Sequence, residues 1–396
     1  MRLVEQEWLR ILAIVVGVVA VALLVTVALA IRTDRRSAAG RHAKLRPSRD
    51  SFRQVEEPPP PPKRAAVIVN PTKIESMEAL RARLDAAMTA QDWQEPLVME
   101  TTAEDPGLGQ TRAALSEGVD LVCAMGGDGT VRAVAQALTG STTPMGLLPA
   151  GTGNLLARNL LVPMDSIEDA VVVATGGRNR HIDVGWITLD PTDVPPTEGH
   201  DKPDEEPGEG AGSPNPGPER QAFLVMAGIG FDAHVMEATS EEFKARVGVA
   251  AYFAQGAKHI FRPRFTTTLV MDGGAPITCK ARTILAGNCG RLTGGITLMP
   301  DAVVDDGELN VVAITAKGIY GLAGAATHIL ARKPESHAQL DRWTARTLEV
   351  TVEDPQKVEI DGDVIGEARH ALVEVEPRSL VVRVSTAVPA TPTLID

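Results

Sequence analysis

The sequence predicts an α/β domain built on a parallel sheet, a β-rich domain after it, and one transmembrane helix before both. From residue 65 to residue 179, short apolar runs alternate with segments of helical spacing, which is typical of strands joined by crossover helices. From residue 180 to residue 385, short alternating runs follow one another, which is typical of an antiparallel sandwich or barrel. An uncharged apolar stretch near the N-terminus predicts the transmembrane helix.

Composition excludes several classes of protein. The chain has 396 residues with 44% hydrophobic residues, enough for two or three domains of about 150 residues each. Its three cysteines form no CxxC pair, which argues against a disulfide scaffold and a cysteine-based zinc site. The net charge of −12 argues against a basic surface for nucleic acid, so we expect no nucleic-acid partner.

The charge is distributed unevenly, and its distribution helps to divide the chain. Residues 1–64 hold 12 basic and 6 acidic side chains, whereas residues 190–220 hold 9 acidic and 2 basic ones with 8 prolines. The second composition cannot form a packed core, so we expect a disordered insertion there. The predicted segments are a flank at 1–10, a transmembrane helix at 11–31, a basic and proline-rich linker at 32–64, an α/β nucleotide-binding domain at 65–179, a β-sandwich at 180–385 with the insert 190–220, and a tail at 386–396.

The apolar stretch is predicted to be a membrane anchor. Ile11 to Ile31 is 21 residues without a charge or a proline, and a helix of that length spans about 31 Å, close to the thickness of the bilayer's hydrocarbon core. Its length and the position of the charges disfavour a core helix or a signal peptide. The positive-inside rule places the following domains in the cytoplasm, on the inner face of the cell membrane. One small-xxx-small pair, Ala13 and Gly17, would allow a homodimer. The basic residues that follow the stretch are Arg32, Arg35, Arg36, Arg41, Lys44, Arg46 and Arg49.

A glycine-rich segment, Gly126–Thr130, lies between a predicted buried strand and a predicted helix. Glycines let a phosphate approach the backbone closely, and the N-terminus of the following helix offers unpaired N–H groups. Asp128 would be unfavourable beside phosphates unless a cation bridges them, so it suggests Mg²⁺. The alternative is an ordinary strand-to-helix turn without a binding function.

Two further segments follow predicted strands. Pro149–Asn154 has the same placement as the first turn and begins its glycines 25 residues later, and Asn70–Lys73 follows the first strand. Ligands of parallel sheets bind outside the carboxyl ends of the strands, so the three segments predict one site. The sequence has no GxxxxGK[ST] loop and no GxGxxG after the first strand.

Carboxylates in the β-rich half are further candidates. Asp306 lies in a glycine-containing turn, and Asp361 and Asp363 flank Gly362. If the latter segment is extended, both carboxylates point to one face, where one pKa would rise to suit a general base. The alternative is that these carboxylates have no functional role, with Asp306 in an ordinary turn and the two acids around Gly362 simply exposed to solvent.

Six short elements occur in a fixed order along the chain. They are Asn70-Pro71-Thr72, Gly126-Gly127-Asp128-Gly129-Thr130, Pro149-Ala150-Gly151-Thr152-Gly153-Asn154, Gly287-Asn288 with Gly294-Gly295 and Met299-Pro300-Asp301-Ala302, Asp305-Asp306-Gly307-Glu308-Leu309, and Ile360-Asp361-Gly362-Asp363. Together they resemble the diacylglycerol kinase catalytic family, which includes bacterial lipid kinases and their sphingosine and ceramide kinase relatives. The resemblance spans Ala65 to Val384, although the GGDGT element alone is shared with NAD kinases and phosphofructokinase-like folds. It implies a parallel sheet of that kind followed by a β-sandwich that helps to form a lipid cleft.

The resemblance implies an ATP site and a structural Mg²⁺ site. The magnesium would be bound by the Asp306 carboxylate and the backbone carbonyls of Val303 and Glu308. On the substrate side we expect Gly151, Gly153, Asn154 and Asn288. The implied ATP-site residues are Asn70, Pro71, Thr72, Lys73, Ile74, Thr102, Gly126, Gly127, Asp128, Gly129, Thr130, Val131, Arg132 and Thr152.

The predicted function is an ATP-dependent lipid kinase with Asp363, Asp361 and Asp128 as catalytic residues. Diacylglycerol is the first choice of acceptor, and sphingosine, ceramide or another lipid alcohol is the second. Asp363 stands where the family usually has Glu, so we expect Asp363 as the base with Asp361 in support, and the reverse stays open. An NAD kinase, a sugar kinase and a membrane-tethered lipid-binding pseudokinase are less favoured functions.

Overall fold

A computed structural model describes residues 62–151, 153–190, 220–230, 264–292, 297–317 and 340–387. The predicted transmembrane helix at 11–31, the linker up to residue 61, Thr152 and nearly all of the acidic insert 190–220 lie outside these residues. Within the described ranges, every helix is too short or too polar to cross a bilayer.

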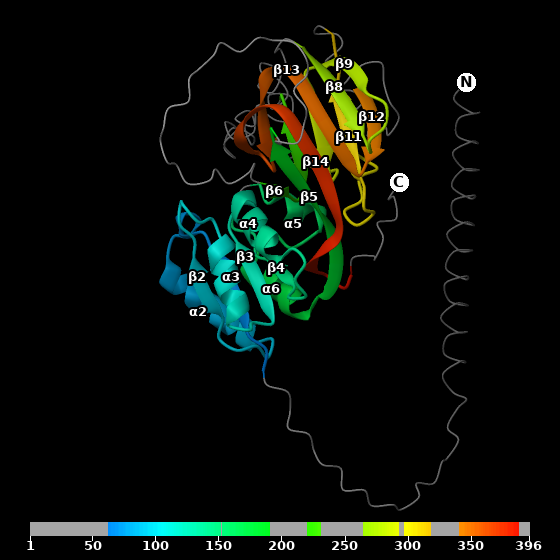
Figure 1. The fold of residues 1–396 in the computed structure, drawn as a ribbon. Helices are drawn as coiled ribbons and strands as arrows, with labels where there is room; N and C mark the ends of the chain where they lie inside the picture. Colours follow the sequence, from blue (N-terminus) through cyan, green and yellow to red (C-terminus); the bar gives the residue numbers. More distant parts are fainter. Residues whose placement is uncertain are drawn as a thin grey trace, which may run out of the picture. The chain divides into compact units, whose positions relative to one another are not determined.

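The first half is an α/β domain with a parallel sheet, as predicted (Figure 1). Its strands lie in the order β4-β3-β1-β2, and each neighbouring pair is parallel. Helices α2 and α6 pack side by side, and so do α3 and α4. The strands are β1 (Ala65–Val69), β2 (Leu97–Glu100), β3 (Leu121–Met125) and β4 (Met145–Leu147), and the helices are η1 (Pro71–Lys73, 3-10), α2 (Met77–Thr89), α3 (Leu108–Ser116), α4 (Asp128–Leu138), α5 (Leu155–Asn159) and α6 (Ile167–Gly176).

Burial explains why these segments become strands and helices. Every residue of β1 and β3 is buried, because helices cover both faces of a parallel sheet. On α2 the buried residues are Leu80, Leu84 and Met88, which recur at the spacing of one helix face. The helix begins at Met77 because the side chain of Ser76 caps it by accepting a hydrogen bond from the Ala79 N–H.

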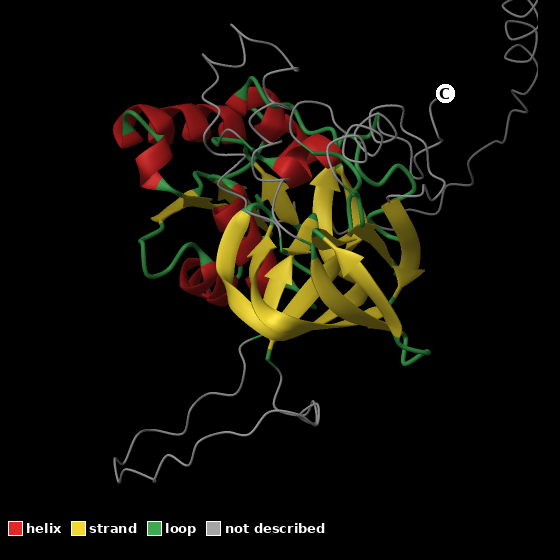
Figure 2. Ribbon diagram, turned by 90° about the horizontal axis from the view of Figure 1, so that it is seen from above, coloured by secondary structure: helices red, strands yellow, loops and turns green. Residues whose placement is uncertain are grey.

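The second half is antiparallel and β-rich, as predicted (Figure 2). Figure 2 shows the helices gathered on one side and the strands of this half on the other. Strands β13 and β14 each join two runs that look separate in the sequence, because irregular registers between Thr351 and Gln356 and between Glu376 and Leu380 interrupt the alternation. The strands are β5 (Arg178–Leu189), β6 (Gln221–Phe223), β7 (Met226–Ile229), β8 (Phe265–Met271), β9 (Ile277–Ala281), β10 (Thr283–Gly287), β11 (Leu309–Ile314), β12 (Leu340–Ala345), β13 (Thr347–Ile360) and β14 (Asp363–Val384).

The last strand, β14, joins the two halves. It is antiparallel to β13 and β5, and near its end Val382 pairs with Met145 of β4 in parallel. The Gly140 N–H also donates a hydrogen bond of 2.8 Å to the Ser379 carbonyl. The described strands therefore form one continuous sheet, and β14 runs from Asp363 to the edge of the parallel strands.

Candidate active site

The carboxyl ends of β1, β3 and β4 bring the three predicted segments together. The Asn70 N–H donates to the Met125 carbonyl, and the Leu148 N–H donates to the Ala124 carbonyl, both at 2.9 Å. The two glycine-rich turns touch, because a Cβ built on Gly151 would lie 2.9 Å from the Cα of Gly127. A side chain at position 151 would force the turns apart, so glycine is required there.

The Asn70 segment closes on itself. Asn70 Oδ1 accepts hydrogen bonds from the Thr72 N–H at 3.1 Å and the Thr72 hydroxyl at 2.7 Å. Lys73 is exposed at the end of this 3-10 turn, and Ile74 packs against the core. Thr102 lies in a neighbouring turn, where its hydroxyl accepts a hydrogen bond from the Asp105 N–H at 3.1 Å. Exposed polar groups therefore flank the site on this side.

Helix α4 begins at Asp128, inside the glycine-rich segment Gly126–Thr130 that the sequence predicts to precede the helix. Gly127 is its N-cap and provides no side chain to bind the first N–H groups. Thr130 and Val131 are buried, and the Val131 N–H donates a hydrogen bond of 3.1 Å to the Gly127 carbonyl. An N-terminus of this kind, at the end of a buried strand, is suited to an anion such as a phosphate.

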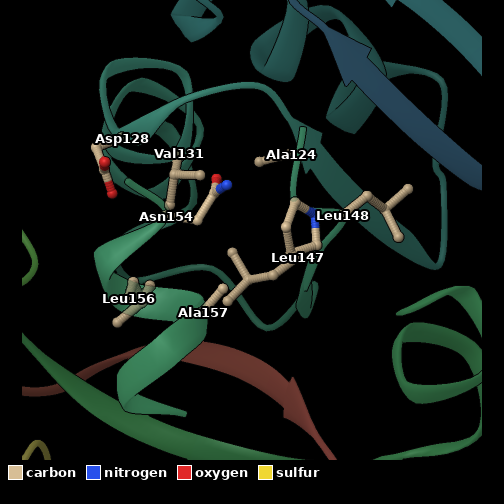
Figure 3. Close-up of a pocket in the computed structure, with 9 residues that line it drawn as sticks. Ala124, Asp128, Val131, Leu147, Leu148, Asn154, Leu156 and Ala157 are labelled. Carbon is tan, nitrogen blue, oxygen red and sulfur yellow. The ribbon is translucent and has the colours of Figure 1, made fainter. Parts of the chain in front are cut away.

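Asp128 links the two glycine-rich turns. Its Oδ1 accepts a hydrogen bond of 2.7 Å from the N–H of Leu155, the first residue of α5. A Cβ on Gly153 would lie 2.2 Å from Asp128 Oδ2, so glycine makes room for the carboxylate. Burial, together with the charges of Asp361 and Asp363, raises the pKa of Asp128 to about 6, and the hydrogen bond from the Leu155 N–H opposes this rise. Figure 3 shows Asp128, Val131 and Asn154 at one side of a small recess whose other side includes Leu147.

Asp361 is buried and forms hydrogen bonds with backbone N–H groups. Its Oδ2 accepts from Leu224 at 2.9 Å, and its Oδ1 accepts from Val225 at 2.8 Å and Met226 at 3.0 Å. The three N–H groups belong to the segment between β6 and β7 and to the first residue of β7, so Asp361 holds the chain where these two strands meet. Burial raises the pKa of Asp361, and the charge of Arg132 and the three N–H groups oppose this rise.

Asp363 is the accessible member of the pair, with a side chain 51% exposed. Its Oδ2 accepts a hydrogen bond of 2.8 Å from Arg132 Nη2, and a Cβ on Gly129 would lie 3.2 Å from the same oxygen. The expectation that Asp361 and Asp363 share one face is wrong. Positive φ angles of 50° at Asp361 and 95° at Gly362 turn the chain, so one carboxylate is buried and the other exposed.

Asp306 belongs to a second cluster of acidic residues, which also includes Asp183 and Glu308. Its Oδ1 accepts a hydrogen bond of 3.0 Å from the Glu308 N–H in its own turn. Burial raises the pKa of Asp306, and the charges of Asp183 and Glu308 add to this rise. The charges that act on Asp128 come instead from Asp361 and Asp363, so the two clusters have different members. The Mg²⁺ site at Asp306, Val303 and Glu308 remains a prediction, and its oxygen donors are of the type that Mg²⁺ takes. Among the described residues, no group of three or more His, Cys, Asp or Glu side chains is arranged to hold a metal.

Asp183 organises this second cluster and was missed by sequence reasoning. Its side chain is fully buried and accepts hydrogen bonds from the Gly307 N–H at 2.7 Å and the Arg378 N–H at 2.6 Å. Its own N–H donates to the Val304 carbonyl at 2.8 Å. The available signal was a lone acid between Ile182 and Val184 in an apolar strand, where a buried charge requires partners.

Asn288 has a different position from the one expected. It is fully buried, and its Nδ2 donates to the Asp183 carbonyl at 2.9 Å and the Leu224 carbonyl at 3.2 Å. The side chain therefore connects the backbone beside the second cluster to the segment that binds Asp361. Asn154 is also buried, and its Nδ2 donates to the Gly151 carbonyl. Gly151 and Gly153 remain partly exposed beside Asp128, and Thr152 lies outside the described residues.

Glycine-rich turns on parallel strands, facing carboxylates from a β-rich half, are features of an enzyme that transfers phosphoryl groups from a nucleotide. Comparison with known proteins agrees. The model of the diacylglycerol kinase catalytic domain matches residues 64–187. The model of the YegS C-terminal NAD kinase beta sandwich-like domain matches residues 225–384. Together they cover more than half of the chain, which belongs to the diacylglycerol kinase-like family of lipid kinases.

Individual relatives are distant. A "Probable lipid kinase YegS-like" of Cronobacter sakazakii is 26% identical over 274 residues, which are 68% of this chain and 80% of that protein. An uncharacterized protein of Synechocystis is 26% identical over 255 residues, and the match spans 63% of this chain and about half of that protein, 52%. A solved structure of a diacylglycerol kinase from Bacillus anthracis aligns with a TM-score of 0.58 at 18% identity, covering 83% of this chain and 98% of that one. The last comparison supports the fold.

Proposed function

We propose that the protein transfers the γ-phosphoryl group of ATP to the hydroxyl of a membrane lipid, with diacylglycerol as acceptor and phosphatidic acid as product. The observation that carries the proposal is the placement of Asp363. This exposed carboxylate from the β-rich half lies against Gly129 in the glycine-rich turn Gly126–Thr130, the proposed nucleotide turn. A base at that position can reach a hydroxyl that approaches a phosphate bound at the turn.

The reaction needs positioning more than covalent chemistry. Backbone N–H groups at the start of α4 and in the glycine-rich turns bind the phosphates. Asp363 accepts the proton of the lipid hydroxyl while the hydroxyl oxygen forms a bond to the γ-phosphorus. The bond from that phosphorus to the bridging oxygen breaks, and ADP leaves with the electron pair. Asp361 holds the turn that carries Asp363, because its carboxylate is occupied by three backbone N–H groups.

A magnesium ion, when bound, would neutralise charge on the transferring phosphoryl group. Asp128 is the side chain at the nucleotide turn that would hold it, directly or through water. The partly exposed turn at Asp306 offers a carboxylate and carbonyls for a second, structural ion.

Acceptors besides diacylglycerol differ in how well the sequence supports them. A sphingosine or ceramide acceptor needs the same hydroxyl chemistry and is the second choice. An NAD or sugar acceptor is disfavoured because such a soluble substrate gains nothing from a membrane anchor. A non-catalytic lipid-binding role is disfavoured because Asp128, Asp361 and Asp363 are all present and gathered.

The direct test is a panel of acceptors with labelled ATP and the full-length protein. Diacylglycerol, sphingosine, ceramide and NAD would each be presented under the same conditions, the lipids in mixed micelles, and products identified by mass spectrometry. We expect phosphatidic acid from diacylglycerol, formed at least about 100-fold more slowly by an Asp363→Asn preparation. Label found on NAD alone, or on no acceptor, would contradict the proposed function.

We also propose that residues 11–31 anchor the protein in the cell membrane with the described domains in the cytoplasm. Support comes from the 21 uncharged residues and the basic residues after them. An anchor confines the enzyme near a substrate that stays in the bilayer and so raises the encounter rate.

Removing residues 1–61 is therefore expected to reduce activity on lipid vesicles at least about tenfold more than activity on detergent-dispersed lipid. The deletion should stop there, because the carbonyl of Pro62 accepts a hydrogen bond from Gln94 and the Arg64 N–H donates to Asp120. Activity measured in both systems checks the expectation. Replacement of the stretch by an unrelated transmembrane helix is the control and should restore vesicle activity. Equal losses in the two systems would refute the anchoring role.

A further inference from the structure

We propose that Arg132 is a positioning residue that fixes the Asp363 carboxylate, and the turn before it, against the helix of the nucleotide site. This inference rests on the proposed function, in which Asp363 is the base. It gives Arg132 a task distinct from phosphate binding.

One guanidinium holds both sides of the turn. Arg132 Nη1 donates to the Ile360 carbonyl at 3.0 Å, and Nη2 donates to Asp363 Oδ2 at 2.8 Å. The Arg132 side chain is only 17% exposed, whereas that of Asp363 is 51% exposed. Because the donors of a guanidinium have a fixed planar geometry, two bonds from one group orient the turn and not only its charge.

The turn needs such support because Asp361 has a φ of 50°, a backbone conformation that residues other than glycine rarely adopt. Gly362 follows with a φ of 95°, which glycine adopts readily. From the inside, Asp361 is held by the N–H groups of the segment between β6 and β7. From the outside, Arg132 is the contact that crosses from α4. Without Arg132, the backbone at Asp363 is still held through Asp361, but the Asp363 side chain loses the hydrogen bond that fixes its orientation.

Arg132 also brings a positive charge to a group of acids. Asp361 lies on the same turn as Asp363, and the charges of both act on Asp128 at the start of α4. Burial raises the pKa of Asp361, and the charge of Arg132 opposes this rise. The guanidinium therefore offsets negative charge at the turn as well as orienting it.

The test compares Arg132→Gln and Arg132→Lys with wild type. For Arg132→Gln we expect kcat to be reduced about 10- to 100-fold and the KM for ATP to change less than about threefold. Arg132→Lys keeps the charge but loses the planar pair of donors, so its kcat should also fall while its KM for ATP stays near that of wild type. The matched control is Arg81→Gln, which removes an exposed ion pair with Glu100 and should leave both constants unchanged.

A double-mutant cycle with Asp363→Ala completes the test, because alanine, unlike asparagine, also removes the hydrogen bond to Arg132. If Arg132 acts through Asp363, the double variant is no less active than Asp363→Ala alone, and the shifts of the two unfolding midpoints do not add. A raised KM for ATP with an unchanged kcat, or losses that multiply in the double variant, would overturn the inference. Should Arg132→Gln fail to fold, Arg132→Lys with Asp363→Ala carries the same cycle.

The two proposals fail in different ways. A wild-type protein that phosphorylates no lipid refutes the proposed function, and the unfolding midpoints of the cycle still decide whether Arg132 and Asp363 are coupled. An active wild type with independent Arg132 and Asp363 refutes the positioning role alone.

Discussion

Asp363→Asn is expected to lower kcat by about 10²- to 10⁴-fold while the protein remains folded, because a general base contributes a factor of that size. Asparagine has nearly the same shape and can still accept the hydrogen bond from Arg132, so the loss would report on the missing base. The side chain is half-exposed, and its replacement leaves no buried group without a partner. Steady-state kinetics with the accepted lipid and a thermal unfolding curve measure the two halves of the expectation.

Two further variants sharpen this test. Glu367→Gln, on the same strand and exposed, is the control and should retain wild-type kcat. Asp361→Asn would be less informative, because it disturbs the buried hydrogen bonds to Leu224, Val225 and Met226 and should also lower the unfolding midpoint. Near-normal turnover in Asp363→Asn would show that the base is another group.

Asp128→Asn is expected to reduce kcat by at least about 10²-fold, since the charge that would hold a cation at the phosphates is removed. The same substitution should make the folded protein more stable at neutral pH. Burial raises the pKa of Asp128 to about 6 from 3.8, so ionisation destabilises the folded state as pH rises between these values. The variant avoids this cost and keeps an oxygen for the Leu155 N–H.

The free energy of unfolding of Asp128→Asn relative to wild type should therefore increase from pH 4 to pH 6 and stay level above. Denaturant titrations of both proteins at pH 4, 5, 6 and 7.5 measure this difference. A variant that is inactive and also equally destabilised at every pH would indicate that Asp128 has a structural role. A fully active variant would remove Asp128 from the mechanism.

The sequence predicts the α/β half well because its signals are local. Buried strands read as apolar runs, and the glycines at 126, 127 and 151 follow strand ends where the chain must pass close to itself. The diacylglycerol kinase resemblance, read from six short elements, is confirmed by the two domain matches. These features depend on neighbours in the chain, which a pattern can record.

The rest depends on contacts between distant residues. The pairing of Val382 with Met145 joins segments more than 200 residues apart, and no periodicity encodes a partner at that distance. Alternation places Asp361 and Asp363 on one face, yet the positive φ at Asp361 reverses the chain between them. In the sequence, Asp183 is a single acid that interrupts an apolar strand. Its hydrogen-bond partners, the N–H groups of Gly307 and Arg378, are more than 120 residues away along the chain.

The shared strand β14 has a consequence for biosynthesis. The outer edge of β4 is covered by residues near position 382, which are synthesised more than 200 residues after β4 itself. During that interval the parallel strands of the nascent chain present an unpaired edge, which is a site for aggregation or chaperone binding. Asp363 also lies on β14. The glycine-rich turns are therefore made well before the strand that brings Asp363 to them, and the edge of the parallel sheet and the candidate site are completed by the same late strand.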